Sequence, residues 1–426
     1  MRHVLLIATT TGYQIRSFGE AAEALGVRLI FASDRCDQLE DPWWDRAIPV
    51  RFHDEAASAG AVVSAFEGSR PDGIVAVGDR PTLLAARVSE TFGLAGNPPR
   101  AAAASRNKLE TRKAFRDAGL PTPWFQAVSM HADPRGLAAS VSYPAVLKPL
   151  ALSGSRGVIR VDNATECVSA FERLRRLLQA PDVRIERDDV HETAMIESFI
   201  PGREYAVEGL LDRGTLRVLA IFDKPDPLDG PFFEETIYVT PSRATGHVRS
   251  RIVEAVSAAT AALGLRHGPV HAECRVDGEV VYVLEVAARP IGGLCSRALR
   301  FRGKGEALVS LEEVLLRHAL GEDVSGYVRE RDASGVMMIP IPQRGVYRRV
   351  EAVEEARAVA GVEDVQITAK PDTVLVPLPE GKSYLGFIFA RAPEPAHVER
   401  ALREAHARLR FTIDREVAVI REAGVT

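Results

Sequence analysis

The stretch "YPAVLKPLALSGSRGV", residues 143–158, joins a short apolar run ending near Lys148 to a small loop of serine, glycine and arginine. A lysine close to glycines is typical of phosphate binding. In a P-loop, however, the glycines come first and the lysine opens the following helix. The order here is reversed. The stretch therefore predicts another design, with strands at 144–150 and 157–163 on either side of the loop.

Length and composition limit the classes of protein to consider. A chain of 426 residues is too long for one compact core, so we expect two or three domains. The net charge of −4 comes from 54 basic and 58 acidic residues spread along the chain, which gives no case for nucleic acid or an anionic membrane as partner. The apolar run at the amino terminus is too short for a signal peptide. No apolar run in the sequence reaches the length of about 18 residues that a helix needs to span a membrane. We expect a cytoplasmic protein.

Four cysteines are far apart in the sequence and form no CxxC pair: Cys36, Cys167, Cys274 and Cys295. This spacing favours reduced, buried thiols over a disulfide framework or a zinc site.

The first hundred residues alternate β-branched runs with helical patterns. Strands are expected at 3–9, 27–33 and 73–79, and helices at 15–25, 55–66 and 81–92. This alternation predicts a parallel sheet with helices on both faces. The first turn, "TTTGYQ", lacks the GxGxxG spacing of a dinucleotide site, so an NAD-binding domain is the weaker interpretation.

The pattern changes after a proline-rich junction and a helix at 107–118. Strand pairs joined by tight turns such as "VDGEV" favour an antiparallel α+β domain. A last segment of strands and helices starts near residue 328 and includes a helix at 395–408. We therefore predict domains at 1–100, 101–327 and 328–426. The remaining elements are expected at these positions: strands 193–200, 203–212, 215–223, 269–277 and 279–289, and helices 164–179 and 249–263.

Two glutamates in neighbouring strands form the first candidate site. Glu273 and Glu285 lie on either side of the Asp277–Gly278 turn, 12 residues apart, so both can lie on one face of a hairpin. Carboxylates among apolar residues are costly to bury without a positive partner. Either a divalent cation such as Mg²⁺ lies between them, or they form ion pairs with Arg275 or Arg289.

Further charged residues fit a nucleotide site only as a set. Lys108 and Lys148 could clamp phosphate oxygens, and Arg289 could bind a transferred phosphoryl group. In "MIESFIPGREYAVEG", Glu197 and Glu204 flank a Pro-Gly turn whose main chain could read a purine edge. Taken alone, that stretch is more simply interpreted as a hairpin with solvated glutamates. Each of the lysines and the arginine, taken alone, is more simply an ordinary surface charge.

In sequence order, seven charged positions resemble the ATP-grasp superfamily: Lys108, Lys148, Glu197, Glu204, Glu273, Glu285 and Arg289. The resemblance covers essentially the whole chain. It implies an α/β and α+β architecture with a Rossmann-like N-terminal domain, a central ATP-grasp domain of two α+β subdomains, and a small C-terminal α+β domain.

The resemblance also implies roles for these residues. Lys108 and Lys148 would bind the α- and β-phosphates of ATP, and Arg289 would steady the γ-phosphate and the developing oxyanion. Glu273 and Glu285 would ligate one or two Mg²⁺ or Mn²⁺ ions. A mobile loop over the phosphates would include Ser153, Gly154, Ser155 and Gly157. The adenosine would lie against main-chain groups near Glu197, Phe199 and Ile200, with Glu204 on the ribose.

Within the superfamily, the chain most resembles the L-amino-acid ligases, through "HAECRV…VLEVAARPIGG", "FFEETIYVTPS" and the length of the third domain. This implies an ADP-forming carboxylate–amine ligase that joins an amino acid or small acid to an amine through an acylphosphate. Substrate contacts would come from Glu235, Tyr238, Gly292 and Gly293. We expect small-molecule partners; the oligomeric state stays open, and a homodimer is the commonest closed assembly in general.

Two positions depart from the family pattern. Ala287 stands where an asparagine ligand of the metal is common, two residues after the second metal glutamate. Tyr238 stands where the ligases often have a histidine, and a tyrosine is no cation at neutral pH. Two alternatives therefore stay open: a carboxylase or formyl-transfer enzyme that uses carboxyphosphate or formyl phosphate, and a nucleotide-binding module without turnover.

Overall fold

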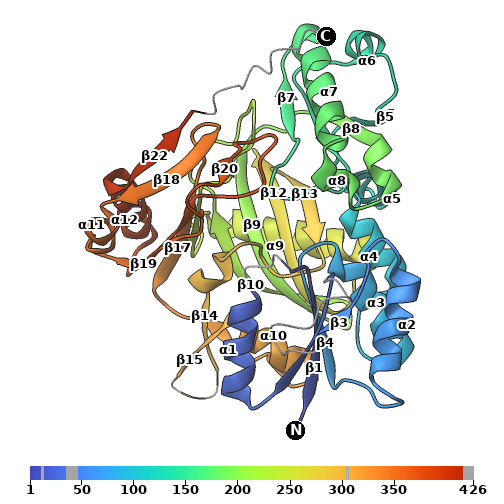
Figure 1. Ribbon diagram of the computed structural model, residues 1–426, viewed down its shortest axis with the longest axis vertical. Helices are drawn as coiled ribbons and strands as arrows, with labels where there is room; N and C mark the ends of the chain where they lie inside the picture. The colour runs from blue at the N-terminus through green and yellow to red at the C-terminus, as the bar shows by residue number, and fades with distance from the viewer. Residues whose placement is uncertain (11–13, 35–46, 304, 306, 416–426) are drawn as a thin grey trace, which may run out of the picture.

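The computed structural model describes residues 1–10, 14–34, 47–303, 305 and 307–415. Cys36 and part of the "TTTGYQ" turn lie outside the described residues. Figure 1 shows three regions: an N-terminal sheet at the bottom, a small green subdomain at the top, and a long central sheet between them that continues into the C-terminal strands.

The N-terminal region is the predicted parallel sheet, with strand order β3-β2-β1-β4. Side chains alternate along β1: Leu5 and Ile7 pack toward α2 and α3, while Val4 and Leu6 pack toward α1. Helices therefore cover both faces. Its elements are β1 (His3–Ala8), α1 (Ile15–Leu25), β2 (Arg28–Ser33), β3 (Ile48–Pro49), α2 (Glu55–Ala65), β4 (Gly73–Val77) and α3 (Pro81–Phe92).

Two short helices lead from this sheet to the next region. α4 (Pro99–Arg106) was not expected from the sequence; its proline occupies the first turn, where a missing N–H costs nothing. α5 (Lys108–Asp117) begins directly after Asn107, whose side chain accepts hydrogen bonds from Leu109 N and Glu110 N. Lys108 is therefore the first residue of this helix.

We call residues 125–198 the small subdomain. It is an antiparallel sheet of order β5-β8-β6-β7 with its own buried core, in which Leu147 packs with Phe171 and Leu174 of α7. The elements are β5 (Phe125–Ser129), α6 (Pro134–Ser140), β6 (Ala145–Pro149), β7 (Ile159–Val161), α7 (Ala164–Leu178), α8 (Pro181–Arg184), η1 (Asp189–Glu192) and β8 (Thr193–Ser198).

The central sheet is antiparallel throughout, in the order β13-β12-β9-β10-β11-β17-β21-β19. Helix α9 packs against β10, β12 and β13, and α12 packs against β17 and β21. The elements are β9 (Arg203–Asp212), β10 (Thr215–Asp223), β11 (Ile237–Thr240), α9 (Gly246–Leu263), β12 (Gly268–Asp277), β13 (Val280–Ala287), β17 (Ala333–Ile339), α11 (Val353–Arg357), β19 (Val362–Ile367), β21 (Gly386–Ala392) and α12 (Pro395–Arg408).

Strands from both sides of residue 328 share this sheet, because β11 pairs with β17. The domain division 1–100, 101–327 and 328–426 stays a proposal, and its second boundary would fall within one sheet. Two small sheets and two further helices complete the described chain: η2 (Cys295–Ala298), β14 (Arg300–Arg302), β15 (Leu308–Ser310), α10 (Leu311–Ala319), β16 (Val328–Arg329), β18 (Gly345–Glu351), β20 (Val374–Leu375) and β22 (Arg410–Asp414).

Two further sequence expectations can be compared with the structure. Cys167, Cys274 and Cys295 are buried and free, as predicted. In the described parts of the chain, no helix combines the length and apolarity needed to cross a membrane.

Candidate active site

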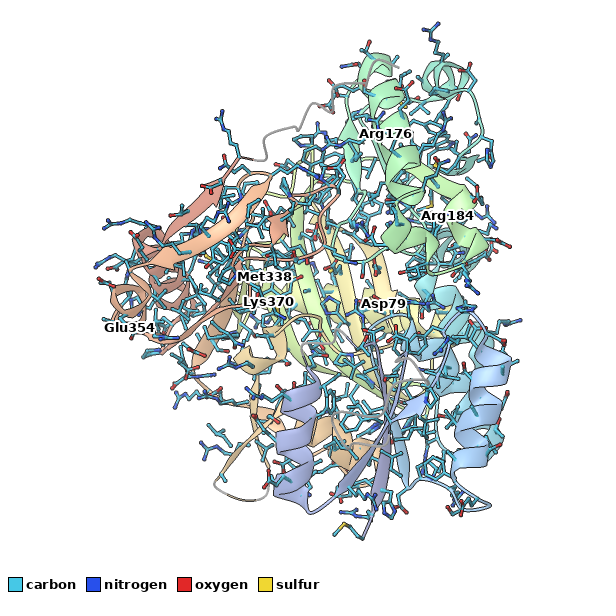
Figure 2. The ribbon with its side chains drawn as sticks, in the orientation of Figure 1. Asp79, Arg176, Arg184, Met338, Glu354 and Lys370 are labelled. Carbon is cyan, nitrogen blue, oxygen red and sulfur yellow. The ribbon has the colours of Figure 1, made fainter. Side chains whose placement is uncertain are left out.

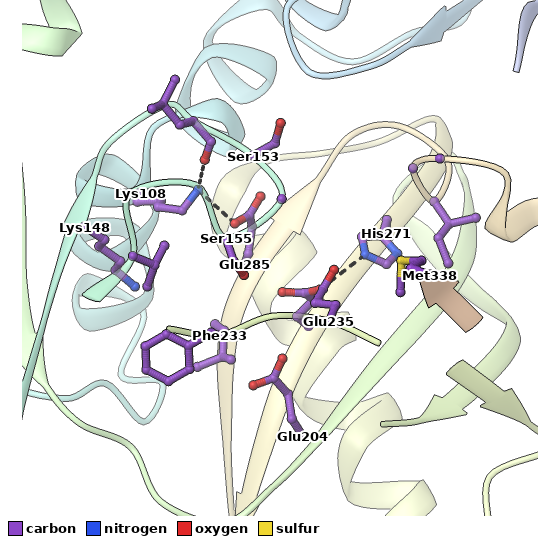
Figure 3. A pocket seen from close by; sticks show the side chains of 18 of the residues that line it. Lys108, Lys148, Ser153, Ser155, Glu204, Phe233, Glu235, His271, Glu285 and Met338 are labelled. Carbon is purple, nitrogen blue, oxygen red and sulfur yellow. Dashed lines mark hydrogen bonds and ion pairs between the residues drawn. The ribbon is translucent and has the colours of Figure 1, made fainter. Parts of the chain in front are cut away.

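A cavity of about 380 Å³ lies between the small subdomain and the central sheet. Figure 3 shows Lys108 and Lys148 on one side of it and Glu204, Glu235 and His271 on the other. The structure brings together nearly all of the residues that the sequence singled out. Those lining the cavity are Lys108, Lys148, Ser153, Gly154, Ser155, Glu197, Phe199, Ile200, Glu204, Glu235, Tyr238, Glu273, Glu285, Arg289, Gly292 and Gly293.

Gly157 is the exception, because it does not line the cavity. It is buried with φ +76°, and a Cβ there would lie 3.0 Å from Leu174 Cδ1 and from Leu177 Cδ2. Its N–H donates to Pro379 O at 2.8 Å. Close packing and a left-handed backbone therefore account for a glycine at this position.

Lys148, on β6, is buried against Glu197 of the adjacent strand β8 and forms an ion pair with it. Arg112 of α5 binds the same carboxylate, with Nε 2.7 Å from Oε2. Burial lowers the pKa of Lys148 to about 8, so the lysine is still a cation at neutral pH. Burial raises the pKa of Glu197, but Arg112 and Lys148 more than offset this and bring it to about 2. Glu197 is only 4% exposed, so the interpretation as a solvated glutamate is wrong.

Lys108, at the start of α5, forms an ion pair with Glu285, the second of the two predicted metal ligands. Its Nζ lies 2.9 Å from Glu285 Oε2 and donates to Leu152 O at 3.0 Å, at the start of the serine-glycine loop. Glu285 lies directly opposite Glu273 in the β12–β13 register, so the prediction that both lie on one face of a hairpin is confirmed.

The two arginines considered as partners for these glutamates bind other carboxylates. Arg275 Nε donates to Glu204 Oε2 at 2.9 Å, and Arg289 Nε donates to Asp79 Oδ1 at 2.8 Å. The ion-pair alternative for Glu273 and Glu285 is therefore not the arrangement observed. Arg275 also donates to Ile200 O at 2.7 Å, which engages one main-chain group of the predicted adenine site.

Lys224, which follows β10, is a site residue that the sequence reasoning missed. Its ammonium lies among three carboxylates, 2.7 Å from Glu204, 2.8 Å from Glu273 and in contact with Glu235. Burial lowers the pKa of Lys224, but these three charges together raise it well above its usual value. The available signal was its position at a strand end in "FDKP", which matches the position of Lys148 in "VLKP".

Tyr238 is 2% exposed and contacts two of the same carboxylates. Its hydroxyl lies 2.8 Å from Glu235 Oε1 and 3.3 Å from Glu273 Oε1, and these two oxygens share its one proton. Burial and the charge of Glu235 raise the pKa of Tyr238 well above its usual value. Where a histidine was expected, the chain thus has a neutral hydrogen-bond donor.

His271 is a second missed residue. It lies two positions before Glu273 on β12, hence on the same face of the strand, and this periodicity was a usable signal. Its Nδ1 contacts the buried Glu208, and its Nε2 lies 3.7 Å from Glu273 Oε1. Burial lowers the pKa of His271, but Glu208 and Glu273 outweigh this and raise it to about 9.

The donor set of the cavity suits a hard divalent cation. One oxygen from each of Glu204, Glu235 and Glu273 lies within 4.8 Å of the others, and Glu285 lies opposite Glu273. Carboxylate oxygens are the ligands that Mg²⁺ prefers, and the ammonium groups of Lys108 and Lys148 suit polyphosphate oxygens. The residues present therefore fit MgATP, and Ala287 adds no donor to the set.

A second group of potential ligands lies outside the cavity, formed by Asp212, His267 and His318. The two imidazole rings stack with centroids 4.2 Å apart and planes inclined by 22°. Nearly parallel rings do not direct their nitrogen lone pairs at one ion, so we assign no metal to this group.

The chain is similar to known proteins along most of its length. Family models match three segments: an ATP-grasp N-terminal domain at 19–96, an ATP-grasp domain at 141–298, and an L-amino acid ligase C-terminal domain 2 at 337–414. The crystal structure of an L-amino acid ligase from Bacillus licheniformis aligns with a TM-score of 0.81 and 28% identity, over 97% of this chain and 99% of that one. The chain is therefore a member of the ATP-grasp superfamily, near the L-amino-acid ligases.

Two proteins of similar sequence match this chain over different shares of its length. Alanine–anticapsin ligase of Bacillus subtilis is 28% identical over 224 residues, which is 49% of this chain and 46% of that enzyme. The uncharacterized protein y4rH of Sinorhizobium fredii is 25% identical over 95% of this chain and 82% of its own length. The match to the characterised ligase thus spans less than half of that enzyme.

Proposed function

We propose that the protein is an ATP-dependent carboxylate–amine ligase that joins an amino acid or a similar small acid to an amine. The acid would be activated as an acylphosphate, and ADP and phosphate would be released. The observation that carries the proposal is the single cavity in which Lys108, Lys148, Glu273, Glu285 and Arg289 meet. The ligases among its relatives support ATP-dependent ligation as the class of reaction.

The charges of the cavity suit the substrates of such a reaction. Lys148 and Lys108 would hold the α- and β-phosphates, and residues 153–157 would close over them. The adenine would lie against the main chain near Phe199 and Ile200, next to the ring of Phe233. Phe199 and Phe233 stack with centroids 6.4 Å apart, so they offer an apolar wall for a base.

The side of the cavity formed by the central sheet, with its glutamates, would hold the metal ion and the acid substrate. Glu273 and Glu285 would ligate Mg²⁺, which supplies charge neutralisation for phosphate oxygens when bound. Arg289 would bind the transferring phosphoryl group, where preorganised charge lowers the barrier. The acid would lie beside the Gly292–Gly293 turn. Cys295, Met338 and Phe387 add an apolar surface beside this turn, so small apolar side chains are the first candidates to test.

The experiment is a screen of the twenty amino acids, singly and in pairs, for phosphate release with MgATP. The proposal expects release that depends on both an acid and an amine, and a hydroxamate when hydroxylamine replaces the amine, because hydroxylamine traps acylphosphates. Bicarbonate- or formate-dependent ADP formation without an amino acid would select the carboxylase or formyl-transfer alternative. Tight MgATP binding without any ADP would select the module without turnover.

A further inference from the structure

The turn that carries Arg289 is tied to the N-terminal domain. Asp79 follows β4, at the edge of the N-terminal sheet that faces the central sheet, where Figure 2 labels it. Its carboxylate accepts two hydrogen bonds from Arg289, from Nε at 2.8 Å and from Nη2 at 3.1 Å. Gln14, only 3% exposed, donates from its side chain to Ile291 O in the same turn. Two residues of one domain thus position a turn of the other.

The contact between Asp79 and Arg289 is ionic and directional. Burial raises the pKa of Asp79, but Arg289, Lys108 and Arg106 outweigh it and hold the pKa below its usual value, so Asp79 is a carboxylate. Arg289 is 8% exposed, and its Nη1 donates to Pro290 O at 3.0 Å. A guanidinium has five N–H donors. Three are used in these contacts, and the Arg289 side chain still lines the cavity.

We propose that Asp79 is a positioning residue for catalysis: it fixes the plane of the Arg289 guanidinium so that the remaining N–H groups face the transferring phosphoryl group. This rests on the proposed function of the same cavity. A planar cation held by a two-point contact is preorganised, and a small displacement of such a group is costly in rate. The N-terminal domain, which supplies no predicted ATP ligand, would then take part in the chemical step.

The test is a mutant cycle of the full-length protein with Asp79→Asn, Arg289→Ala and the double variant. Asp79→Asn keeps the shape of the side chain but loses its charge. We expect kcat to fall by about 10- to 100-fold, in the range of a misplaced catalytic group, while KM for ATP changes by less than about threefold because ground-state binding is retained. The double variant should be no slower than Arg289→Ala, since Asp79 acts through Arg289.

Asp72→Asn is the matched control for the loss of a carboxylate charge in the same domain. Asp72 accepts a hydrogen bond from His3 N at 2.7 Å, and its variant should keep the parental kcat.

Two results would overturn the inference: parental kcat in Asp79→Asn, whether or not its melting temperature falls, or effects that multiply in the double variant. A second readout needs no acceptor substrate. Vanadate with MgADP mimics a transferring phosphoryl group, so Asp79→Asn should bind MgADP–vanadate at least about tenfold more weakly while MgADP binding is unchanged. If the parent protein releases no phosphate with any amino-acid pair, the proposed function fails, and the vanadate comparison still decides the role of Asp79.

Discussion

Lys148 lines one side of the cavity, and Lys224 contacts the carboxylates that line the other side; the pKa values of these two buried lysines shift in opposite directions. Burial lowers the pKa of Lys148 to about 8, since a single carboxylate, Glu197, is shared between it and Arg112. The pKa of Lys224 lies well above its usual value, because Glu204, Glu235 and Glu273 outweigh the cost of burial.

The difference shows how the cavity divides its charge. On the side of the small subdomain, two cations face one carboxylate, which leaves positive charge for phosphate. On the side of the central sheet, the carboxylates outnumber the cations, which leaves negative charge for a metal ion. The carboxylates are Glu204, Glu208, Glu235 and Glu273, and the cations are Lys224, Arg275 and His271. A nucleotide with a bound metal ion carries the complementary charges.

Lys224→Met should be the most damaging change. It removes the buried ammonium from between three partly buried carboxylates, and breaking a buried ion pair costs about 3–5 kcal/mol in the free energy of unfolding. Millimolar Mg²⁺ should recover part of that loss, because a cation can replace the ammonium. Denaturant unfolding with and without Mg²⁺ measures both effects. Lys113→Met, at an exposed pair with Glu110, is the control; equal stability of the two variants would refute the charge division.

Lys148→Met should act on binding more than on stability. Glu197 keeps its contact with Arg112, so the fold is preserved. Loss of a charged contact with phosphate, worth about 1.5–3 kcal/mol, should weaken MgATP binding by roughly 10- to 150-fold. Calorimetric titration with MgATP measures this. Parental affinity would remove Lys148 from the phosphate site, and a stability loss as large as that of Lys224→Met would make the two sides equivalent.

The lowered pKa of Lys148 predicts a pH dependence of MgATP binding. A phosphate binds the protonated lysine, so affinity should be constant below pH 8 and fall by up to about tenfold per pH unit above it, until the pKa of the bound state is reached. Lys148→Arg stays charged over this range and should abolish the decline. A parental profile that is flat to pH 10, or one that falls equally in Lys148→Arg, would contradict this assignment.

Tyr238→Phe should have the smallest effect. The ring keeps its packing on Phe222, with centroids 5.6 Å apart, and only the hydrogen bonds to Glu235 and Glu273 are lost. A net loss of about 0.5–1.5 kcal/mol corresponds to a two- to tenfold lower kcat/KM for phosphate release. Loss of MgATP binding in this variant would show that the hydroxyl organises the whole cavity and is not a local donor.

Local sequence patterns were enough to predict part of the fold and the site. The parallel N-terminal sheet was predicted from the alternation of strand and helix patterns in the first hundred residues. The pairing of Glu273 with Glu285 was predicted from the Asp277–Gly278 turn between them. Strands β9 and β10 match their predicted bounds because each ends at a polar turn. These features depend on neighbours within one hairpin or one βα unit.

What the sequence did not reveal depends on distant parts of the chain. The contact of Asp79 with Arg289 joins residues 210 positions apart. The cluster around Lys224 combines β9, β10 and β12 with the segment before β11, and no local pattern states that these strands are neighbours. The pairing of β11 with β17 likewise crosses the predicted boundary at residue 328.

The central claim is that an acid is activated by phosphoryl transfer between the two sides of the cavity. The most direct measurement uses an acid substrate from the amino-acid screen with ¹⁸O in its carboxylate, followed by mass spectrometry of the released phosphate. One ¹⁸O is expected in each phosphate, because the carboxylate oxygen that attacks the γ-phosphate leaves with it. Amide formed together with unlabelled phosphate would contradict activation of the acid by phosphoryl transfer.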